Sequence, residues 1–119
     1  MLVKMLKSKL HRARVTETNM DYAGSVAIDP DLMEAVGILP YEVVAIADVT
    51  NGNRLETYAV EAERGSREVI VMGAAVHLIK KDDVIIIFSF VDLDIEEAKT
   101  HKPSVVALDE NNIIIKKIC

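Results

Sequence analysis

The dipeptide Gly24-Ser25 has the residue types of a peptide bond that can rearrange to an ester. A serine hydroxyl held against the carbonyl of the preceding residue can attack it and convert the peptide bond into an ester. Glycine suits the position before the serine, because it has no Cβ to block the attack or to forbid a strained backbone conformation. The chain contains a second such dipeptide, Gly65-Ser66, which is most simply a turn. The surrounding sequence must therefore distinguish the two.

Other kinds of catalytic or binding site find little support in the residue spacing. The three histidines, His11, His77 and His101, lack the closely spaced ligand pairs of a zinc site, so we expect no metal and interpret His77 and His101 as structural or surface residues. The five glycines are dispersed, which argues against a phosphate-binding loop. No Gly-x-Ser-x-Gly motif indicates a Ser-His-Asp triad. Cys119 is the only cysteine, which excludes an intramolecular disulfide.

Length and composition describe the scaffold that must position such a site. The 119 residues predict a single domain spanning 1–119. Aromatic residues make up only 4% and tryptophan is absent, so Val, Ile, Leu, Ala and Met must build the core, which favours a mainly β protein. The net charge is −5 and the basic residues are scattered, so we expect no nucleic-acid partner. The longest apolar stretch is too short to cross a bilayer and the N-terminal sequence does not resemble a signal peptide, so we expect a cytoplasmic protein without a membrane partner.

Local patterns predict many short strands and one or two helical turns. Asp29-Pro30 precedes the segment 31–36 and Gly37 follows it, and these are residue types that begin and end helices. The dipeptide Asn51-Gly52 accepts positive φ at both positions of a hairpin turn. The near-continuous apolar run in 84–90 is typical of a strand buried on both faces. This density of strands predicts a small closed barrel. We expect one long bent strand or two short ones over 2–15, strands over 26–28, 43–49, 55–60, 69–72, 84–90, 105–108 and 113–118, and helices over 31–36 and 92–99.

Five segments together resemble the bacterial aspartate 1-decarboxylase family, whose members make β-alanine for pantothenate and coenzyme A. The resemblance covers roughly Met5 through Leu108 and fades after Asp109. It implies a six-stranded double-psi β-barrel with short helices, assembled as a homotetramer. The segments are Lys9-Leu10-His11-Arg12, Tyr22-Ala23-Gly24-Ser25-Val26-Ala27-Ile28-Asp29, Asn51-Gly52-Asn53-Arg54-Leu55-Glu56-Thr57-Tyr58, Glu63-Arg64-Gly65-Ser66 and Gly73-Ala74-Ala75.

The same resemblance implies that the chain is an inactive proenzyme that cuts itself between Gly24 and Ser25. Residues 1–24 would become the β chain and residues 25–119 the α chain. In the family, the ester formed by the serine undergoes β-elimination to dehydroalanine, which hydrolyses to a covalent pyruvoyl group at the new N-terminus. This ketone condenses with the amino group of L-aspartate and accepts the electrons left by carbon dioxide, so neither pyridoxal phosphate nor a metal is expected.

The resemblance also assigns roles to individual side chains. Tyr58 is the implied proton donor, although packing on a neighbouring residue of the hairpin would also account for it. Arg54 is the implied carboxylate ligand, for which an exposed charge at a strand end is the alternative. Thr57 is implied in processing and substrate binding. The remaining implied residues are Lys9 as a second cation, Gly73, Ala74 and Ala75 as a wall of small residues against the substrate, His11 as a candidate proton acceptor, and Tyr22 as a candidate hydrogen-bond partner near the scissile bond.

One residue departs from the family pattern. The family commonly has Asn immediately before Gly73, whereas this chain has Met72, which cannot donate an amide hydrogen bond. That hydrogen bond must come from the backbone, water or another residue, which puts efficient self-processing in question. Two alternatives remain open: a non-catalytic β-barrel that binds a partner, and the same chemistry on another small acidic amino acid. Self-cleavage would exclude the first, and the length of the pocket around Arg54 would decide the second.

Overall fold

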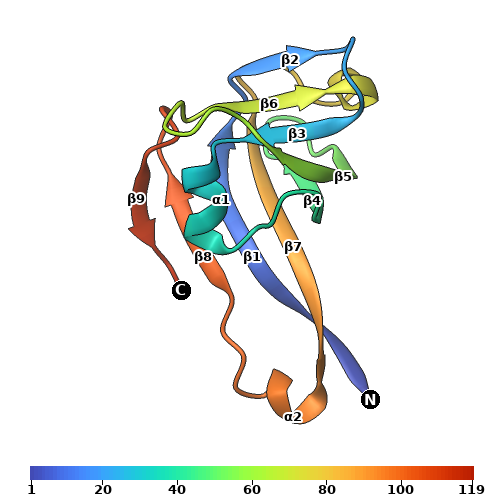
Figure 1. Ribbon diagram of the computed structural model, residues 1–119, viewed down its shortest axis with the longest axis vertical. Helices are drawn as coiled ribbons and strands as arrows, with labels where there is room; N and C mark the ends of the chain where they lie inside the picture. Colours follow the sequence, from blue (N-terminus) through green and yellow to red (C-terminus); the bar gives the residue numbers. More distant parts are fainter.

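The computed structural model describes residues 1–119 and is mainly β, as predicted. Its strands form one mixed sheet in the order β2-β6-β3-β5-β4-β7-β1-β8-β9 (Figure 1). A 3-10 helix, η1, directly follows β6. No helix of the structure is both long and apolar enough to cross a bilayer. The elements are β1 (Leu2–Arg14), β2 (Glu17–Asn19), β3 (Ser25–Ile28), α1 (Pro30–Val36), β4 (Val43–Asp48), β5 (Arg54–Glu61), β6 (Val69–Met72), η1 (Gly73–His77), β7 (Val84–Asp94), α2 (Ile95–Ala98), β8 (Ser104–Leu108) and β9 (Ile114–Lys117).

Strands β1 and β7 form a long antiparallel pair that extends below the body of the molecule and ends near α2 (Figure 1). The pairing slips between Leu6 and Ser8 and again between Leu10 and Ala13. At the second slip Arg12 has a φ of 68°, which is typical of a β-bulge that bends its strand. The prediction of one long bent strand over this segment is therefore confirmed.

Three parallel pairings connect strands that are distant in sequence: β1 with β8, β2 with β6, and β3 with β5. Strand β3 lies between β5 and β6, with Val26 opposite Ala59 on one side and Ser25 opposite Met72 on the other. The Gly24-Ser25 junction thus lies beside the middle of β5 and the end of β6. This register decides which residues surround the Gly24-Ser25 bond.

Helix α1 forms as the sequence predicts. The Asp29 carboxylate accepts a hydrogen bond from the Asp31 N–H at 2.9 Å, Pro30 occupies the first turn, and Gly37 ends the helix with a φ of 77°. Asp29 also accepts N–H bonds from Gly65 at 3.1 Å and Arg67 at 2.8 Å. These hydrogen bonds lower the pKa of Asp29 even though burial alone would raise it, so the cap stays ionised at neutral pH.

The hydrophobic core consists of 20 buried side chains and contains no aromatic residue. The composition predicted this, because β-branched residues and leucine had to replace the missing aromatic volume. The largest fully buried members come from β1, β3, β4, β6, β7, α1 and the connections after β1 and before β7: Leu10, Ile28, Met33, Ile46, Ile79, Ile85, Ile87, Val15, Val26, Val36, Val44 and Val69.

The structure corrects several expectations about the strands. The sheet contains nine strands, and the sequence analysis did not predict β2, because this strand is short and polar. Strand β7 is not buried on both faces in the single chain: Ile85 and Ile87 are buried, while Ile86 and Phe88 are only half-buried. It also extends to Asp94, because pairing with β1 continues past the body, so α2 retains only four residues of the expected acidic helix.

Both predicted hairpins form, β4 with β5 and β8 with β9. The turn between β4 and β5 differs from the expectation, since only Gly52, with a φ of 81°, adopts positive φ. The Gly52 N–H donates to the Asp48 carbonyl at 2.8 Å, and the Asp48 N–H donates to the Asn53 carbonyl at 2.8 Å. The loop is longer than a two-residue turn because these hydrogen bonds close it between residues 48 and 53.

Candidate active site

Ser25 begins β3 and is almost completely buried, with 4% of its surface exposed. Its hydroxyl donates to the Ala23 carbonyl at 3.3 Å, so it folds back over the bond that joins it to Gly24. Gly24 itself is exposed and its φ is not positive. The backbone at position 24 is therefore not in the left-handed region that favours glycine. Tyr22, two residues before the junction, is 64% exposed.

A pocket of about 470 Å³ lies against the Gly24-Ser25 junction. Its volume is within the range of small-ligand sites. It brings together five of the residues that the sequence analysis singled out, Gly24, Thr57, Tyr58, Ala74 and Ala75. Six others are not part of its lining: Lys9, His11, Tyr22, Ser25, Arg54 and Gly73. Its lining residues are Gly24, Leu55, Glu56, Thr57, Tyr58, Ala74, Ala75 and Leu78.

The first residues of η1 form the wall opposite β5. Gly73 is buried and has a φ of 75°, whereas Ala74 is exposed and Ala75 is half-buried. A change from the extended backbone at Met72 to positive φ at Gly73 turns the chain out of β6 and into the 3-10 helix. Small side chains after this turn keep the pocket open beside Gly24.

Tyr58 packs beside a second tyrosine that the sequence analysis did not single out. The rings of Tyr58 and Tyr41 have centroids 6.4 Å apart and are tilted by 32°. Tyr41 is 77% exposed and has a φ of 69°, which is rare for a bulky residue. Its N–H donates to the Ala59 carbonyl at 2.7 Å, so β5 holds this backbone in place. No local pattern predicts positive φ at a tyrosine, so only the structure reveals this neighbour.

Arg54 and Lys9, the two predicted cations, lie on different strands of the sheet. Arg54 begins β5 and is exposed, opposite Ala47 of β4. Lys9 of β1 lies opposite Phe88 of β7, and β7 and β4 separate β1 from β5. Three strand spacings correspond to about 14 Å along the sheet. Neither cation forms an ion pair, so both remain available to a ligand or to another chain.

His11 is half-buried on β1, and its Nδ1 atom is buried without a hydrogen-bond partner. Burial lowers the pKa of His11, and the positive charges of Lys9 and Arg12 lower it further. The imidazole is therefore neutral at pH 7 and able to accept a proton. It lies opposite Ala107 of β8, outside the pocket beside Gly24.

A buried carboxyl pair lies at the ends of β4 and β7. One oxygen of Asp48 accepts the Thr50 N–H at 2.8 Å, and the other is buried without a donor. Asp83 accepts the Lys80 N–H at 3.0 Å. Burial, followed by the neighbouring Asp83, raises the pKa of Asp48 to about 6. The sequence analysis missed this pair because the two aspartates are 35 residues apart in an unremarkable context.

Two asparagine side chains connect the β4–β5 loop to the segment after η1. The Asn51 and Asn53 amides donate to the Leu78 carbonyl at 3.2 Å and 2.9 Å. Leu78 also lines the pocket beside Gly24. The asparagines that the sequence analysis assigned to a turn therefore hold the start of β5 against the wall of the pocket.

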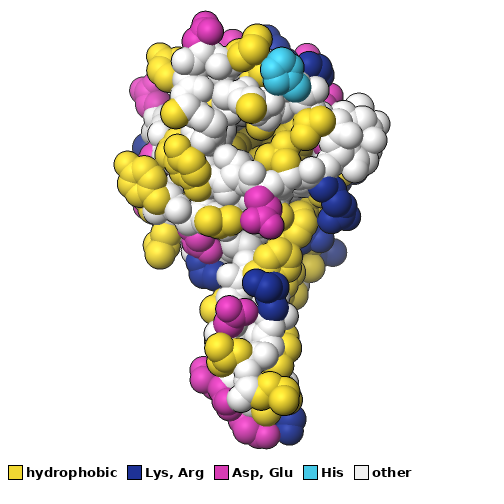
Figure 2. All heavy atoms as spheres, turned by 90° about the vertical axis from the view of Figure 1, so that its right-hand side faces the viewer, with side chains coloured by type: hydrophobic (Ala, Val, Ile, Leu, Met, Phe, Trp, Pro, Cys, Tyr) yellow, Lys and Arg dark blue, Asp and Glu magenta, His cyan; other side chains and the backbone are white.

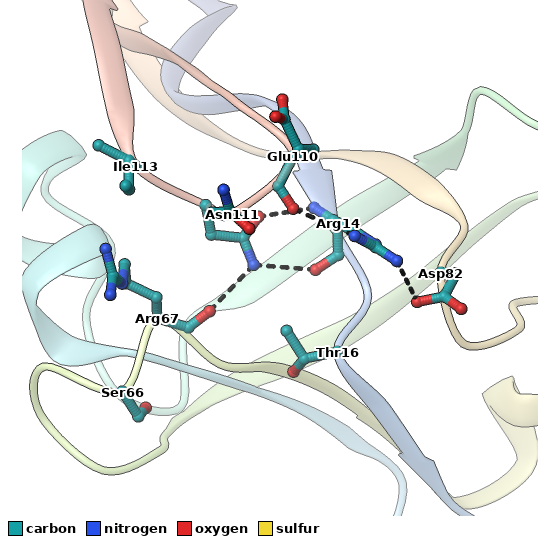
Figure 3. Close-up of a pocket in the computed structure, with 9 residues that line it drawn as sticks. Arg14, Thr16, Ser66, Arg67, Asp82, Glu110, Asn111 and Ile113 are labelled. Atoms are coloured by element: carbon teal, nitrogen blue, oxygen red, sulfur yellow. Dashed lines mark hydrogen bonds and ion pairs between the residues drawn. The ribbon is translucent and has the colours of Figure 1, made fainter.

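A second hollow of about 480 Å³ contains none of the predicted site residues (Figure 3). Its polar groups bond one another. The Asn112 amide donates to the carbonyls of Arg14 at 3.0 Å and Arg67 at 2.9 Å, and its oxygen accepts the Arg14 N–H at 2.7 Å. The Arg14 guanidinium pairs with Asp82 at 2.7 Å (Figure 3). The hydrogen bonds around this hollow join the turn 109–112, which precedes β9, to the end of β1; we call this region the C-terminal joint. Ser66, on its rim, lies in the turn 63–66, which confirms the interpretation of the second Gly-Ser dipeptide.

Comparison with known proteins identifies the family. The aspartate decarboxylase family model matches residues 1–115, so the similarity continues beyond Asp109, after which the sequence analysis expected it to fade. An aspartate 1-decarboxylase from Caulobacter vibrioides is 52% identical over 98% of both chains. Those from Clostridium kluyveri and Staphylococcus aureus (strain JH9) are 48% identical over 98% and 99% of this chain and 91% and 93% of their own. The chain belongs to the aspartate decarboxylase family.

Proposed function

We propose that this chain cuts itself between Gly24 and Ser25 and then converts L-aspartate to β-alanine and carbon dioxide, for pantothenate and coenzyme A synthesis. Family membership supports the reaction. The observation that carries the cleavage site is the buried Ser25 hydroxyl, which lies over its own junction beside a pocket of ligand size. Gly65-Ser66, which lies in an exposed turn away from this pocket, has no such setting.

The cleavage begins when the Ser25 Oγ attacks the Gly24 carbonyl carbon. The new C–O bond forms as the C–N bond breaks, and the hydroxyl proton moves to the Ser25 nitrogen, giving an ester and a free amine. Removal of the Ser25 α-proton then expels the Gly24 carboxylate and leaves dehydroalanine. Water hydrolyses this residue to a pyruvoyl group and releases ammonia. The overall change consumes one water molecule, releases one ammonia molecule and requires no oxidant or metal.

The residues around position 25 fit a group attached there. Ser25 pairs with Met72 of β6, and the next residue, Val26, pairs with Ala59 of β5, which anchors the start of β3, although Met72 has no amide side chain to contribute. The pyruvoyl group supplies a ketone that binds the substrate amine and withdraws the electron pair released with carbon dioxide. We assign Thr57 to processing and substrate binding, and Gly73, Ala74 and Ala75 to the wall against the substrate. This assignment is supported by the pocket beside Gly24, which is lined by Thr57, Ala74 and Ala75.

We assign Tyr58 as the acid that returns a proton to the carbon that carbon dioxide leaves. Its phenol lines the pocket, and the Tyr41 ring beside it restricts its position. His11 is assigned as a proton acceptor, because its lowered pKa keeps it neutral. Tyr22 is assigned as a hydrogen-bond partner of the segment before the scissile bond, where it remains exposed.

We further propose that the active assembly is a homotetramer built from double-psi β-barrels. Arg54 and Lys9 bind substrate carboxylate in this proposal. The wide separation of Lys9 from β5 and the absence of intrachain partners favour cations that reach the site of a neighbouring copy. Parallel pairing of non-consecutive strands is consistent with the barrel.

Exposed apolar side chains supply surface for such contacts. They lie on the body of the molecule and on the arm, the part of the β1–β7 pair that extends beyond the body. Figure 2 shows hydrophobic side chains at the surface over both regions. The exposed large hydrophobic residues include Leu2, Met20, Tyr22, Leu39, Tyr41, Val43, Phe90, Ile95, Ile115 and Ile118.

Intact mass spectrometry of the purified protein tests the proposed function. We expect fragments 1–24 and 25–119, with the larger fragment lighter by one ammonia than a serine-terminated chain and blocked to Edman degradation. A Ser25→Ala variant should remain intact. Borohydride in the presence of L-aspartate should attach the substrate to fragment 25–119, and activity should not require pyridoxal phosphate. A chain that stays whole after prolonged warm incubation would contradict the proposal and favour a binding module.

A further inference from the structure

Gly73 lies directly against the backbone of the scissile segment. A Cβ atom at position 73 would lie 2.5 Å from the Gly24 Cα, 2.7 Å from the Gly24 nitrogen and 3.1 Å from the Tyr22 carbonyl oxygen. All three neighbours are main-chain atoms, so no side-chain rotation could relieve the overlap. Only a residue without a Cβ permits this contact between the start of η1 and the segment before Ser25.

We propose that Gly73 is a positioning residue for self-cleavage, because its missing side chain determines where the Gly24 carbonyl lies relative to the Ser25 hydroxyl. This inference rests on the proposed cleavage between these two residues. It concerns the first step, in which the Ser25 Oγ–C bond forms, the Gly24–Ser25 C–N bond breaks and the hydroxyl proton moves to the Ser25 nitrogen. The contact lies on the carbonyl side of that bond.

The two residues of the scissile bond are held differently, so a larger residue at position 73 would change their relative positions. Ser25 is paired to Met72 within β3 and β6 and is buried, which anchors its backbone. Gly24 precedes the strand and is exposed. To reach ordinary contact at 3.4 Å, Gly24 would have to move by about 0.9 Å. A misplacement of about 1 Å in a reacting group can cost about 10²-fold in rate.

Gly24 itself has more space than Gly73. A Cβ at position 24 would meet only the Met72 carbonyl oxygen, at 4.0 Å, and its φ is not positive. The close contact at the cleavage site therefore depends on the glycine at position 73, 49 residues beyond the scissile glycine in sequence. This separates steric positioning by Gly73 from the requirement for a small residue next to the serine.

Gly37 offers a matched control for substitutions at Gly73. Its φ is 77°, against 75° at Gly73, and an added Cβ would meet nothing within 4 Å. Substitution of either glycine by Ala imposes the same left-handed strain, and substitution by Asn imposes less, since asparagine tolerates positive φ. Only the variants at position 73 add a clash with Gly24.

The experiment follows cleavage of the wild type, Gly73→Ala, Gly73→Asn, Gly37→Ala and Gly37→Asn by intact mass over time. Each protein is first isolated in its folded form by size exclusion. We expect both Gly73 variants to cleave about 10²-fold more slowly than their Gly37 counterparts. Hydroxylamine, which cuts esters, should release no additional fragments from the Gly73 variants, because the defect precedes ester formation. If Gly73 variants and Gly37 variants have the same thermal stability, a general loss of structure cannot explain slower cleavage of the Gly73 variants.

Each result has a distinct meaning. Wild type that fails to cleave would refute the proposed function itself. Wild-type cleavage together with normal cleavage of the Gly73 variants would overturn the positioning inference alone. Accumulation of a hydroxylamine-sensitive ester in these variants would place the defect after the first step and would also overturn it. If both Gly73 variants failed to fold while both Gly37 variants folded, the contact would serve folding, and the inference would again be wrong.

Discussion

Replacement of Asp48 by Asn tests the buried carboxyl pair that lies behind the β4–β5 loop. Asp48 is only 2% exposed, and one of its oxygens has no hydrogen-bond donor. A proton on Asp48 would let it donate to Asp83, whereas two buried carboxylates repel each other. Asparagine has nearly the same shape and carries an N–H donor at every pH. In the variant, the contact between residue 48 and Asp83 therefore no longer depends on the protonation of residue 48.

The sign of the effect follows from the direction of the pKa change. The pKa of Asp48 rises from 3.8 to about 6 on folding, mainly through burial. A raised pKa contributes stability that is fully present below the unfolded value and is lost as the pH rises through the folded value. The difference between the two values corresponds to about 3 kcal/mol of unfolding free energy. The wild type should lose most of this contribution between about pH 4 and pH 7, whereas Asp48→Asn should not.

Urea unfolding at both pH values, at one protein concentration, measures this difference. Every protein should carry Ser25→Ala, so that all chains remain uncleaved. The unfolding free energy of Asp48→Asn relative to its parent should rise by about 2.4 kcal/mol from pH 4 to pH 7, less than the full difference because Asp48 of the unfolded parent is already partly ionised at pH 4. Asp29 and Glu42, whose pKa values are lowered, remain in both proteins and cancel in the comparison. Asp92→Asn, an exposed position on the arm, controls for the substitution itself. An identical stability difference at both pH values would refute the reasoning.

Four further predictions concern the site, the assembly and the C-terminal joint. Tyr58→Phe keeps the ring against Tyr41 but removes the acid, so fully processed protein should turn over aspartate roughly 10²-fold more slowly, while cleavage proceeds normally; parental turnover would exclude this role. Arg54→Lys keeps the charge but loses the bidentate geometry, so KM for aspartate should rise more than kcat falls, and unchanged kinetics would remove Arg54 from the site. Light scattering at micromolar concentration should give a tetramer mass, and a monomer mass would contradict the proposed assembly. Asn112→Gly removes three hydrogen bonds at a buried position without adding strain at the positive φ of 58° found there, and should lower the unfolding free energy by about 2 kcal/mol in urea, a loss that would be absent if the joint were unimportant.

Features that depend on neighbours in sequence could be predicted without the structure. Asp29, Pro30 and Gly37 define both ends of α1, because capping hydrogen bonds and positive φ are properties of a few consecutive residues. The Asn51-Gly52 segment predicted a hairpin for the same reason, although its exact turn depends on hydrogen bonds made by residues 48 and 53. The absence of tryptophan likewise predicted an aliphatic core.

The sequence motifs around Gly24-Ser25 identified the family and the candidate residues, because their types and order are specific. Tertiary structure alone decided that β3 lies between β5 and β6, which brings Gly24, Thr57 and Ala74 to one pocket. It also decided the contact of Gly73 with Gly24 and the burial of Asp48 beside Asp83. Parallel pairing between distant strands leaves no local signal, since its register depends on how the whole core packs. Steric contact, burial and pKa depend on the residues that this packing brings together.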